Sequence, residues 1–236
     1  MQLTTPAVDT TRTPAEGRPL RIGVLAIQSG FHEHQVMLHR AAANAEVVQV
    51  RTKAELEDPA LDGLVIPGGE STTMSIVAQR SGAWDALHAF VRKRPVWGTC
   101  AGMILLSADA LNQKKDGQAL LGALPITVRR NRFGSQVDSF QIELQEPVEV
   151  LSEGDKGSAG FPALFIRAPV VEKVGEDVKV LTWLPRTSGE SSEAVAVRHG
   201  DILACAFHPE LTGDDRWHRY FVRMVADARR AREAAA

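Results

Sequence analysis

The sequence predicts an α/β fold in which a mixed, mainly parallel sheet is flanked by helices and continued by an antiparallel extension. Two observations support this prediction. Through the first hundred residues, apolar runs of strand length alternate with helical patterns, which is typical of a parallel sheet. From about Ile126 onward, the apolar runs are short and are joined by Gly, Ser and Pro without long helices, which indicates antiparallel pairing.

The first half of the chain supplies the parallel strands and most of the helices. Each expected strand is an apolar run of a few residues, and each expected helix follows such a run. The elements expected here are strands at 21–27, 46–50, 63–66 and 96–97, and helices at about 31–43, 72–79 and 84–93.

The second half supplies the antiparallel strands and a terminal helix. Short strands are expected between 126 and 144, at 163–166 and at 179–184, and a last strand at 202–207. The terminal helix has an apolar face that consists of Trp217, Phe221, Met224, Val225 and Ala228.

The ends of the chain differ in composition from the middle. Residues 1–20 are polar and rich in proline, so they are expected to form a disordered leader. A single domain is expected over 21–228, followed by a flexible tail at 229–236. A chain of 236 residues can bury a continuous core without disulfide or metal staples.

Composition excludes several classes of function. A formal charge of -2 gives no general attraction to nucleic acid or to an anionic membrane. No apolar run has the length of a membrane span or the character of a signal peptide. With only two cysteines, the chain fits a reducing compartment, and we expect a cytoplasmic protein.

One of the two cysteines lies in a motif that is typical of a nucleophile. Gly98-Thr99-Cys100-Ala101-Gly102 follows an apolar run and resembles a nucleophile elbow, in which small residues flank a strained turn between strand and helix. A thiol there is exposed to substrate and lies near a helix N-terminus, which favours the thiolate. Taken alone, the motif also fits an ordinary tight connection. Cys205 lies within an apolar strand and is interpreted as core.

His208-Pro209-Glu210 supplies a base and a carboxylate. Because one residue separates His208 from Glu210, an extended segment projects both side chains to the same side. Glu210 can then hold the imidazole while the imidazole faces Cys100. Without the cysteine motif, a capping or core histidine beside a surface carboxylate is the simpler interpretation.

Acyl transfer also requires donors for a developing oxyanion. Gly68 and Gly69 follow a predicted strand, and their backbone can approach a substrate closely. We expect the N–H groups of Gly69 and Ala101 to form the oxyanion hole. The alternative for Pro67-Gly68-Gly69 is an ordinary turn at a strand end.

Five motifs together resemble one family. They are Gly68-Gly69-Glu70-Ser71-Thr72-Thr73-Met74, Gly98-Thr99-Cys100-Ala101-Gly102, the stretch from Arg130 to Phe140, Phe165-Ile166-Arg167-Ala168-Pro169 and Phe207-His208-Pro209-Glu210. With these motifs the chain resembles, from about Arg21 to Val225, the glutaminase subunit of pyridoxal 5'-phosphate synthase, the Pdx2/PdxT family of class I glutamine amidotransferases. The resemblance implies a three-layer class I glutamine amidotransferase-like fold and a single glutaminase domain over 21–228.

The resemblance also implies a reaction, the hydrolysis of L-glutamine to L-glutamate and ammonia. Cys100 would attack the side-chain amide, His208 would shuttle the proton, and Glu210 would orient His208. Water would then hydrolyse the glutamyl thioester. Two alternatives share parts of this pattern: another amidotransferase subunit, for example one for histidine or purine synthesis, and a non-catalytic module with the same fold. An intact triad argues against the module.

Substrate-binding residues follow from the same resemblance. Arg130 is expected to bind the glutamine carboxylate, because a guanidinium can contact both oxygens. Gly68, Gly69 and Glu70, together with the backbone of Ile166 and Arg167, are expected to enclose the substrate. Arg129 and Arg132 are interpreted as a solvated strand edge.

The resemblance implies a partner but no cofactor. Ammonia would pass to the barrel subunit of pyridoxal 5'-phosphate synthase, of the Pdx1/PdxS type, in a large hetero-oligomer. Pyridoxal 5'-phosphate is then the product of the complex, and no cofactor is expected for this chain. Where the family has Leu-Gln-Gly, this chain has Ile27-Gln28-Ser29-Gly30, a departure that bears on how the loop rearranges on docking.

A possible metal motif does not fit its template. His32-Glu33-His34 lacks a second histidine four positions after the first, as a zinc-protease helix requires, because Val36 occupies that position. We therefore expect no metal, and we interpret this segment as a surface or interface helix.

Overall fold

The structure is a computed structural model that describes residues 18–112, 117–130, 139–145, 150, 160–185 and 192–235. The helices are α1 (Phe31–Ala41), α2 (Lys53–Leu56), α3 (Ser71–Arg80), α4 (Trp84–Phe90), α5 (Ala101–Leu106) and α6 (Arg216–Ala234), with a 3-10 turn η2 (Pro209–Leu211). The strands are β1 (Arg21–Leu25), β2 (Glu46–Val50), β3 (Gly63–Ile66), β4 (Val96–Thr99), β5 (Ser107–Leu111), β6 (Leu124–Arg129), β7 (Phe140–Leu144), β8 (Phe161–Phe165), β9 (Val170–Val174), β10 (Lys179–Leu184), β11 (Glu193–His199) and β12 (Ile202–Cys205).

The parallel half of the main sheet has the strand order β2-β1-β3-β4-β12. Every residue of β3, β4 and β12 is buried, as expected for strands that are covered on both faces. The order reverses beside β1, and in such sheets ligands bind outside the carboxyl ends of the strands near that point. The segments that follow β1, β3, β4 and β12 therefore meet at one edge of the sheet.

The remaining strands extend this sheet mainly by antiparallel pairing. β11 pairs antiparallel with β12, β9 and β10, and β9 pairs antiparallel with β6, whereas β5 lies parallel to β6 at the far edge. β7 and β8 form a separate antiparallel pair. The predicted antiparallel extension is confirmed.

Several short elements are not predicted by the sequence. α2 is a single turn that a Thr52/Glu55 capping box begins, which is too short to produce a helical period. β5 and β9 each contain exposed positions among few buried ones, so their apolar pattern is weak. β11 falls between the strands expected at 179–184 and 202–207, in a stretch for which no element was predicted.

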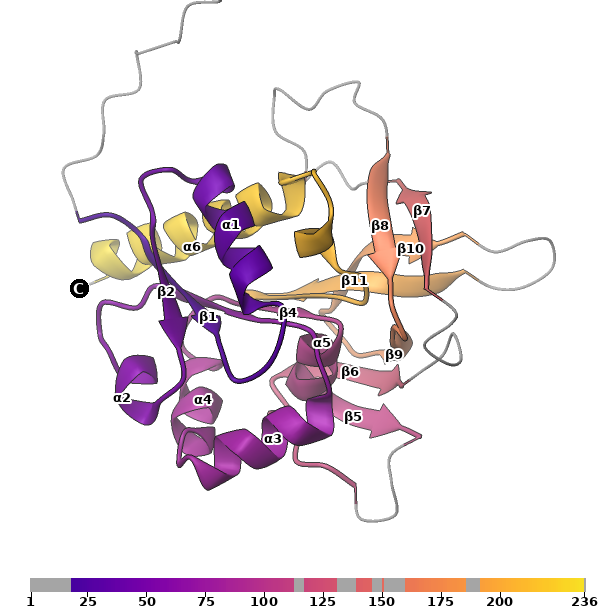
Figure 1. Ribbon diagram of the computed structural model, residues 1–236, viewed down its shortest axis with the longest axis horizontal. Helices are drawn as coiled ribbons and strands as arrows, with labels where there is room; N and C mark the ends of the chain where they lie inside the picture. The colour runs from indigo at the N-terminus through magenta and orange to yellow at the C-terminus, as the bar shows by residue number, and fades with distance from the viewer. Residues whose placement is uncertain are drawn as a thin grey trace, which may run out of the picture.

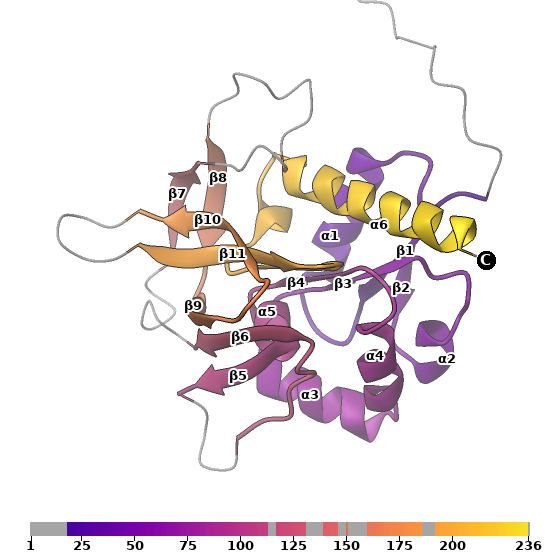
Figure 2. The same ribbon diagram turned by 180° about the vertical axis from the view of Figure 1, so that it is seen from behind.

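Helices cover both faces of the parallel strands and complete a three-layer α/β fold (Figure 1). α1 packs against α6 on one face, whereas α4 contacts both α2 and α3 on the other face, where α3 also contacts α5 (Figure 2). Periodic burial explains the packing of α6, because Trp217, Phe221, Met224 and Val225 all face the core as predicted.

Ion pairs tie the two ends of the described chain together. Asp62, just before β3, is fully buried and bonds both terminal nitrogens of Arg18 at 2.8 and 2.9 Å. Arg232 Nη2 lies 3.1 Å from the same carboxylate, and Arg229 Nη1 lies 3.7 Å away. Burial raises the pKa of Asp62, but Arg18 and the Arg21 N–H outweigh it, so the pKa lies below its usual value.

These contacts involve residues at both predicted ends of the domain. The predicted tail at 229–236 is helical as far as Ala234, because α6 continues and its arginines bind Asp62 and the Arg18 carbonyl. Of the predicted leader at 1–20, residues 1–17 lie outside the described residues, and Arg18 belongs to the ion-pair cluster.

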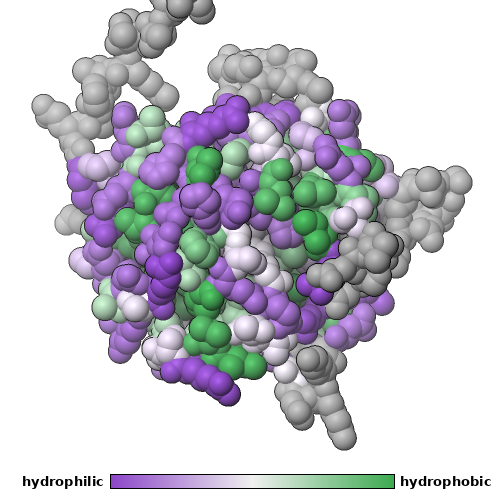
Figure 3. Space-filling model, in the orientation of Figure 1, coloured by the Kyte–Doolittle hydropathy of each residue, from purple (hydrophilic) through white to green (hydrophobic). Residues whose placement is uncertain are grey.

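Among the helices that the structure describes, none has the length and apolar content needed to cross a bilayer. Hydrophilic residues are interspersed with small hydrophobic groups over the face seen in Figure 3.

Candidate active site

Cys100 lies on a strained turn between β4 and α5. Its backbone has φ 49° and ψ -105°, a conformation that costs free energy in a residue with a side chain. Strain of this kind at a strand-to-helix turn is the geometry of a nucleophile elbow, which aims the side chain away from the sheet. The predicted elbow at Cys100 is present.

The flanking glycines are required by close packing. A Cβ on Gly102 would lie 2.0 Å from the carbonyl oxygen of Ile66, and a Cβ on Gly98 would lie 2.6 Å from the backbone of Gly102. Both distances are far below van der Waals contact. The elbow therefore excludes every side chain at these two positions.

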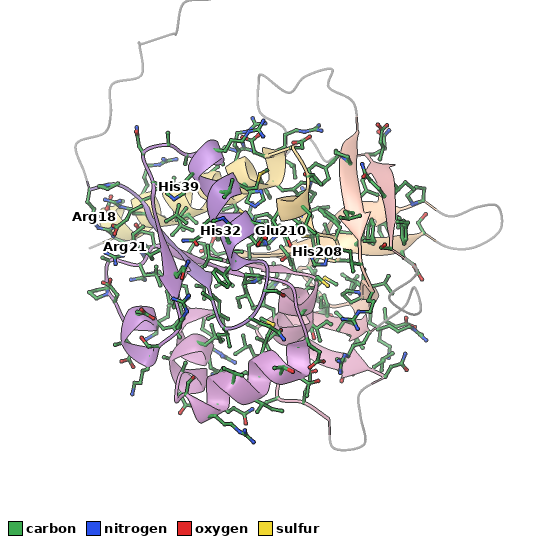
Figure 4. The ribbon with its side chains drawn as sticks, viewed as in Figure 1. Arg18, Arg21, His32, His39, His208 and Glu210 are labelled. Atoms are coloured by element: carbon green, nitrogen blue, oxygen red, sulfur yellow. The ribbon has the colours of Figure 1, made fainter. Side chains whose placement is uncertain are left out.

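His208 and Glu210 form a hydrogen-bonded pair beside the cysteine. His208 Nδ1 lies 2.8 Å from Glu210 Oε1, and the two side chains are 11% and 2% exposed. They follow β12, which is paired with β4. Figure 4 shows both residues together, well away from Arg18 and Arg21 at the edge of the molecule.

The surroundings of the pair favour a charged imidazole and a charged carboxylate. Burial lowers the pKa of His208, but hydrogen bonds with Cys100 and Glu210 outweigh burial and raise it to about 10. Burial raises the pKa of Glu210, but His34 and His208 outweigh burial and bring it below its usual value. An imidazolium held between a sulfur and a carboxylate can give a proton to a leaving group.

The turn after β3 approaches this pair with its backbone. A Cβ on Gly68 would lie 2.6 Å from His208 Cε1, and Gly69 has φ 137°, which favours glycine. Gln28 supports the turn, because its Oε1 accepts a hydrogen bond of 2.7 Å from the backbone N–H of Glu70.

All the predicted site residues line one pocket of about 720 Å³, a volume within the usual range for small-molecule sites. The sequence predicted ten of its lining residues: Gly68, Gly69, Glu70, Cys100, Ala101, Arg130, Ile166, Arg167, His208 and Glu210. Gln28, Ser29, Gly30, Glu33, Ser71, Ile104 and Leu211 complete the lining.

A charged pair lies in the pocket wall. Arg130 Nη2 lies 2.9 Å from Glu70 Oε1, and only 12% of the arginine side chain is exposed. Among the described residues nothing accepts a hydrogen bond from Arg130 Nε, so this buried donor is available to a ligand. Glu70 also caps α3 by accepting a hydrogen bond of 2.8 Å from the Thr73 N–H. Arg129 lies outside the pocket and pairs with Glu172, and Arg132 lies outside the described residues.

The segment after β8 closes the pocket from the antiparallel side. Cys100 Sγ lies 3.9 Å from the carbonyl oxygen of Ile166. The next residue, Arg167, has φ 45°, which is a rare conformation for a residue with a side chain. The backbone of Ile166 thus lies beside the Cys100 sulfur.

Two buried histidines near Glu210 are absent from the sequence prediction. The segment His32-Glu33-His34 was interpreted as a surface or interface helix; His32 and Glu33 are exposed, whereas His34 is fully buried. His34 contacts His218 of α6, which is also fully buried. A signal was available, because His34, Met37 and Leu38 share the helical spacing of a buried face.

Among the described residues, no three His, Cys, Asp or Glu side chains are grouped so that they could hold a metal ion.

The fold and the pocket define an α/β protein with a cysteine on a strained turn between strand and helix. The model of the SNO glutamine amidotransferase family matches residues 24–227, and the chain belongs to this family. The resemblance that the sequence motifs indicated is confirmed.

Named relatives are similar over nearly their whole length. The chain is 48% identical over 207 residues to the pyridoxal 5'-phosphate synthase subunit PdxT of Dehalococcoides mccartyi, which covers 87% of this chain and 97% of the relative. It is 47% identical over 212 residues to the subunit of the same name from Rhodococcus opacus, with coverage of 88% and 98%.

A solved structure is also similar. The crystal structure of a glutamine amidotransferase matches with a TM-score of 0.72 and 40% sequence identity, and the match covers 87% of this chain and 98% of that one. The fold prediction, a three-layer arrangement of the glutamine amidotransferase type, is thus confirmed.

Proposed function

We propose that this chain hydrolyses L-glutamine to L-glutamate and ammonia, with Cys100 as nucleophile, His208 as general acid and base, and Glu210 as the residue that orients His208. The observation that carries the proposal is the pocket itself. A strained cysteine, a hydrogen-bonded histidine and carboxylate, and a buried arginine all line it.

The reaction proceeds in two halves. The thiolate of Cys100 adds to the amide carbon, His208 protonates the amide nitrogen, and the carbon–nitrogen bond breaks to release ammonia and leave a glutamyl thioester. Water then gives a proton to His208 and adds to the thioester carbon. Cleavage of the carbon–sulfur bond releases glutamate and returns the free cysteine.

Two backbone N–H groups would stabilise the charge on the carbonyl oxygen. Gly69 follows β3 and Ala101 follows the nucleophile, and both line the pocket beside Cys100. Loss of one donor of this kind typically costs about 3 kcal/mol of transition-state stabilisation. The N–H of Gly69 depends on the turn that Gln28 supports.

The charged ends of the substrate match the charged pair in the pocket wall. The guanidinium of Arg130 suits the α-carboxylate of glutamine, and its free Nε adds a donor. The carboxylate of Glu70 suits the α-ammonium group. Burial raises the pKa of Glu70, but hydrogen bonds from Thr73 outweigh burial, so the carboxylate is charged at neutral pH. Gly68 and the backbone of Ile166 and Arg167 enclose the side chain of the glutamine substrate.

The ammonia is used by a second subunit. Relatives named as pyridoxal 5'-phosphate synthase subunits support the proposal that this chain feeds a synthase barrel of the Pdx1/PdxS type through a protected path. Glutaminase activity is expected to be weak alone and markedly higher with that subunit.

Glutamine-dependent formation of pyridoxal 5'-phosphate tests the proposal. The chain is mixed with a barrel subunit, pentose phosphate, triose phosphate and glutamine, and the product is measured. Cys100→Ala is expected to abolish synthesis, and ammonium salt is expected to restore it. Cys205→Ala is the matched control and is expected to keep synthesis. Retained glutamine turnover in Cys100→Ala would contradict the triad, and equal turnover with and without the barrel would contradict the coupling.

A further inference from the structure

Two buried imidazoles lie in line behind Glu210. His34 Nδ1 of α1 lies 3.0 Å from His218 Nε2 of α6, and His34 Nε2 lies 3.3 Å from Glu210 Oε2. The same His34 Nε2 lies 3.1 Å from Thr99 Oγ1. His34, His218 and Thr99 are all fully buried. One side chain thus contacts both the orienting carboxylate and the residue before the nucleophile.

This line of side chains is separate from the pocket. His34 and His218 do not line it, whereas Glu210 does. Burying polar groups is costly unless they are hydrogen-bonded, and two apolar residues would pack at lower cost in this core. The two histidines therefore need a reason other than packing, and the contact with Glu210 supplies one.

The contacts favour one tautomer of His34. Glu210 Oε1 is bound by His208, whereas Glu210 Oε2 accepts no hydrogen bond in the described part of the chain. A carboxylate oxygen attracts an N–H and repels a ring nitrogen lone pair. If His34 carries its proton on Nε2, this N–H is within hydrogen-bond distance of Thr99 Oγ1 at 3.1 Å and lies 3.3 Å from Glu210 Oε2, a contact that is not aligned as a hydrogen bond. Nδ1 of His34 then accepts from the Nε2–H of His218. The opposite tautomer would turn a lone pair toward a buried anion.

The electrostatic surroundings agree with neutral rings. Burial lowers the pKa of His34, although Glu210 opposes this, and burial lowers the pKa of His218 well below its usual value. Neutral rings are donors without net charge, so they hold the carboxylate without taking its proton.

We propose that His34 is a positioning residue of the glutaminase reaction, which holds Glu210 by the electrostatic attraction between its neutral Nε2–H and Oε2, and that His218 fixes the tautomer of His34. This inference rests on the function proposed above. In this arrangement Glu210 has one oxygen for each imidazole. His34 sets the position of Oε2, Oε1 then meets His208 Nδ1, and His208 Nε2 is left for the chemistry at Cys100.

Kinetics of three variants test this role. His34→Leu removes the donor and is expected to lower kcat about 10-fold to 100-fold, the range known for loss of the hydrogen-bond partner of a metal-binding histidine, which is oriented in a comparable way. KM is expected to stay within about twofold, because His34 does not line the pocket. His34→Gln keeps an N–H at the same reach and is expected to recover most of kcat. Leu38→Ala, a core substitution on the same helix, is expected to lower the melting temperature and keep kcat.

Failure of the inference and failure of the function can be told apart. Full kcat in His34→Leu, with Cys100→Ala inactive, overturns the inference alone. Equal loss in His34→Leu and His34→Gln overturns it as well, because packing then explains the effect. Glutamine turnover by Cys100→Ala overturns the proposed function and this inference together.

A measurement on the unmutated chain covers the case in which His34→Leu does not fold. Long-range ¹H–¹⁵N spectra of the histidine-labelled protein report which ring nitrogen carries the proton. We expect Nε2 protonation for both His34 and His218. A proton on Nδ1 of His34 overturns the proposal.

Discussion

Cys100 and Cys205 are the two cysteines of the chain, and they lie at adjacent strand ends with opposite surroundings. The N–H of Cys100 donates a hydrogen bond of 2.8 Å to the carbonyl oxygen of Cys205. Cys100 has φ 49° and faces the pocket, whereas Cys205 lies within β12 and is fully buried. Burial raises the pKa of the Cys205 thiol well above its usual value.

The difference shows that position on the backbone, not residue type, separates a cysteine that lines the pocket from one that packs in the core. Cys205 continues the strand, so its sulfur packs like a small apolar group. Cys100 turns out of the sheet one residue beyond Thr99, which pairs with Cys205. A single strained residue thus moves the second sulfur into the pocket.

Selective alkylation tests directly whether Cys100 and Cys205 differ in accessibility. Iodoacetamide is expected to modify Cys100 and to remove glutaminase activity, because the buried Cys205 thiol is not accessible. Peptide mass analysis after partial inactivation identifies the modified residue. Cys205→Ala is the control and is expected to keep activity and alkylation. Modification of Cys205 at the same rate would show that the two thiols are equally accessible.

Gly102→Ala tests the turn that separates the two sulfurs. The new Cβ would lie 2.0 Å from the Ile66 carbonyl oxygen, so either the elbow or β3 must shift. We expect a loss of about 3 kcal/mol in unfolding free energy, at the upper end of overpacking effects, with activity also lost. Urea denaturation measures the loss in unfolding free energy. Gly213→Ala is the control, since nothing lies within 4 Å of its Cβ. Equal stability of the two variants would contradict the packing argument.

Arg130→Gln separates substrate binding from nucleophile reactivity. Removing a charge-assisted hydrogen bond typically costs about 2 kcal/mol, so KM for glutamine is expected to rise about 30-fold. The rate of Cys100 alkylation without glutamine is expected to stay the same, while protection by glutamine is lost. Arg129→Gln is the control, because Arg129 pairs with Glu172 outside the pocket. An unchanged KM in Arg130→Gln would remove Arg130 from the substrate site.

The pH dependence of the unfolding free energy tests the raised pKa of His208, which lies beside Cys100 but not beside Cys205. The pKa of His208 is raised from 6.5 to about 10, so its protonated form stabilises the folded state. This contribution is complete below about pH 6.5 and is lost as pH rises through about 10. We expect the difference in unfolding free energy between the unmutated chain and His208→Gln to shrink from pH 6.5 to pH 10. A constant difference would contradict the raised pKa.

Local patterns in the sequence were enough to predict most of the site. Gly98-Thr99-Cys100-Ala101-Gly102 encodes a turn whose packing needs small residues, and His208 and Glu210 are close in sequence, so their pairing is a local matter. Arg130 was predicted from a family motif and not from physical reasoning. The structure brings these residues to one pocket, while their roles stay predictions.

The contacts behind Glu210 could not be predicted in the same way. His34 and His218 are 184 positions apart and meet because α1 packs against α6, which no local pattern specifies. The helical spacing of His34 with Met37 and Leu38 indicated burial of His34 but not its partner. Likewise, the ion pairs of Asp62 with Arg229 and Arg232 explain why α6 extends beyond the predicted domain end.

The Asp62 ion pairs also indicate where a dye or a surface linker can be attached without covering the pocket. Asp62 precedes β3, whereas Gly68 follows it, so the joined chain ends and the pocket lie at opposite ends of this strand. A strand rises about 3.3 Å per residue, so the six steps from Asp62 to Gly68 span roughly 20 Å. A dye or surface linker at the C-terminal end of α6 therefore leaves the pocket mouth open, which suits single-molecule and surface-binding measurements with glutamine or with the proposed partner subunit.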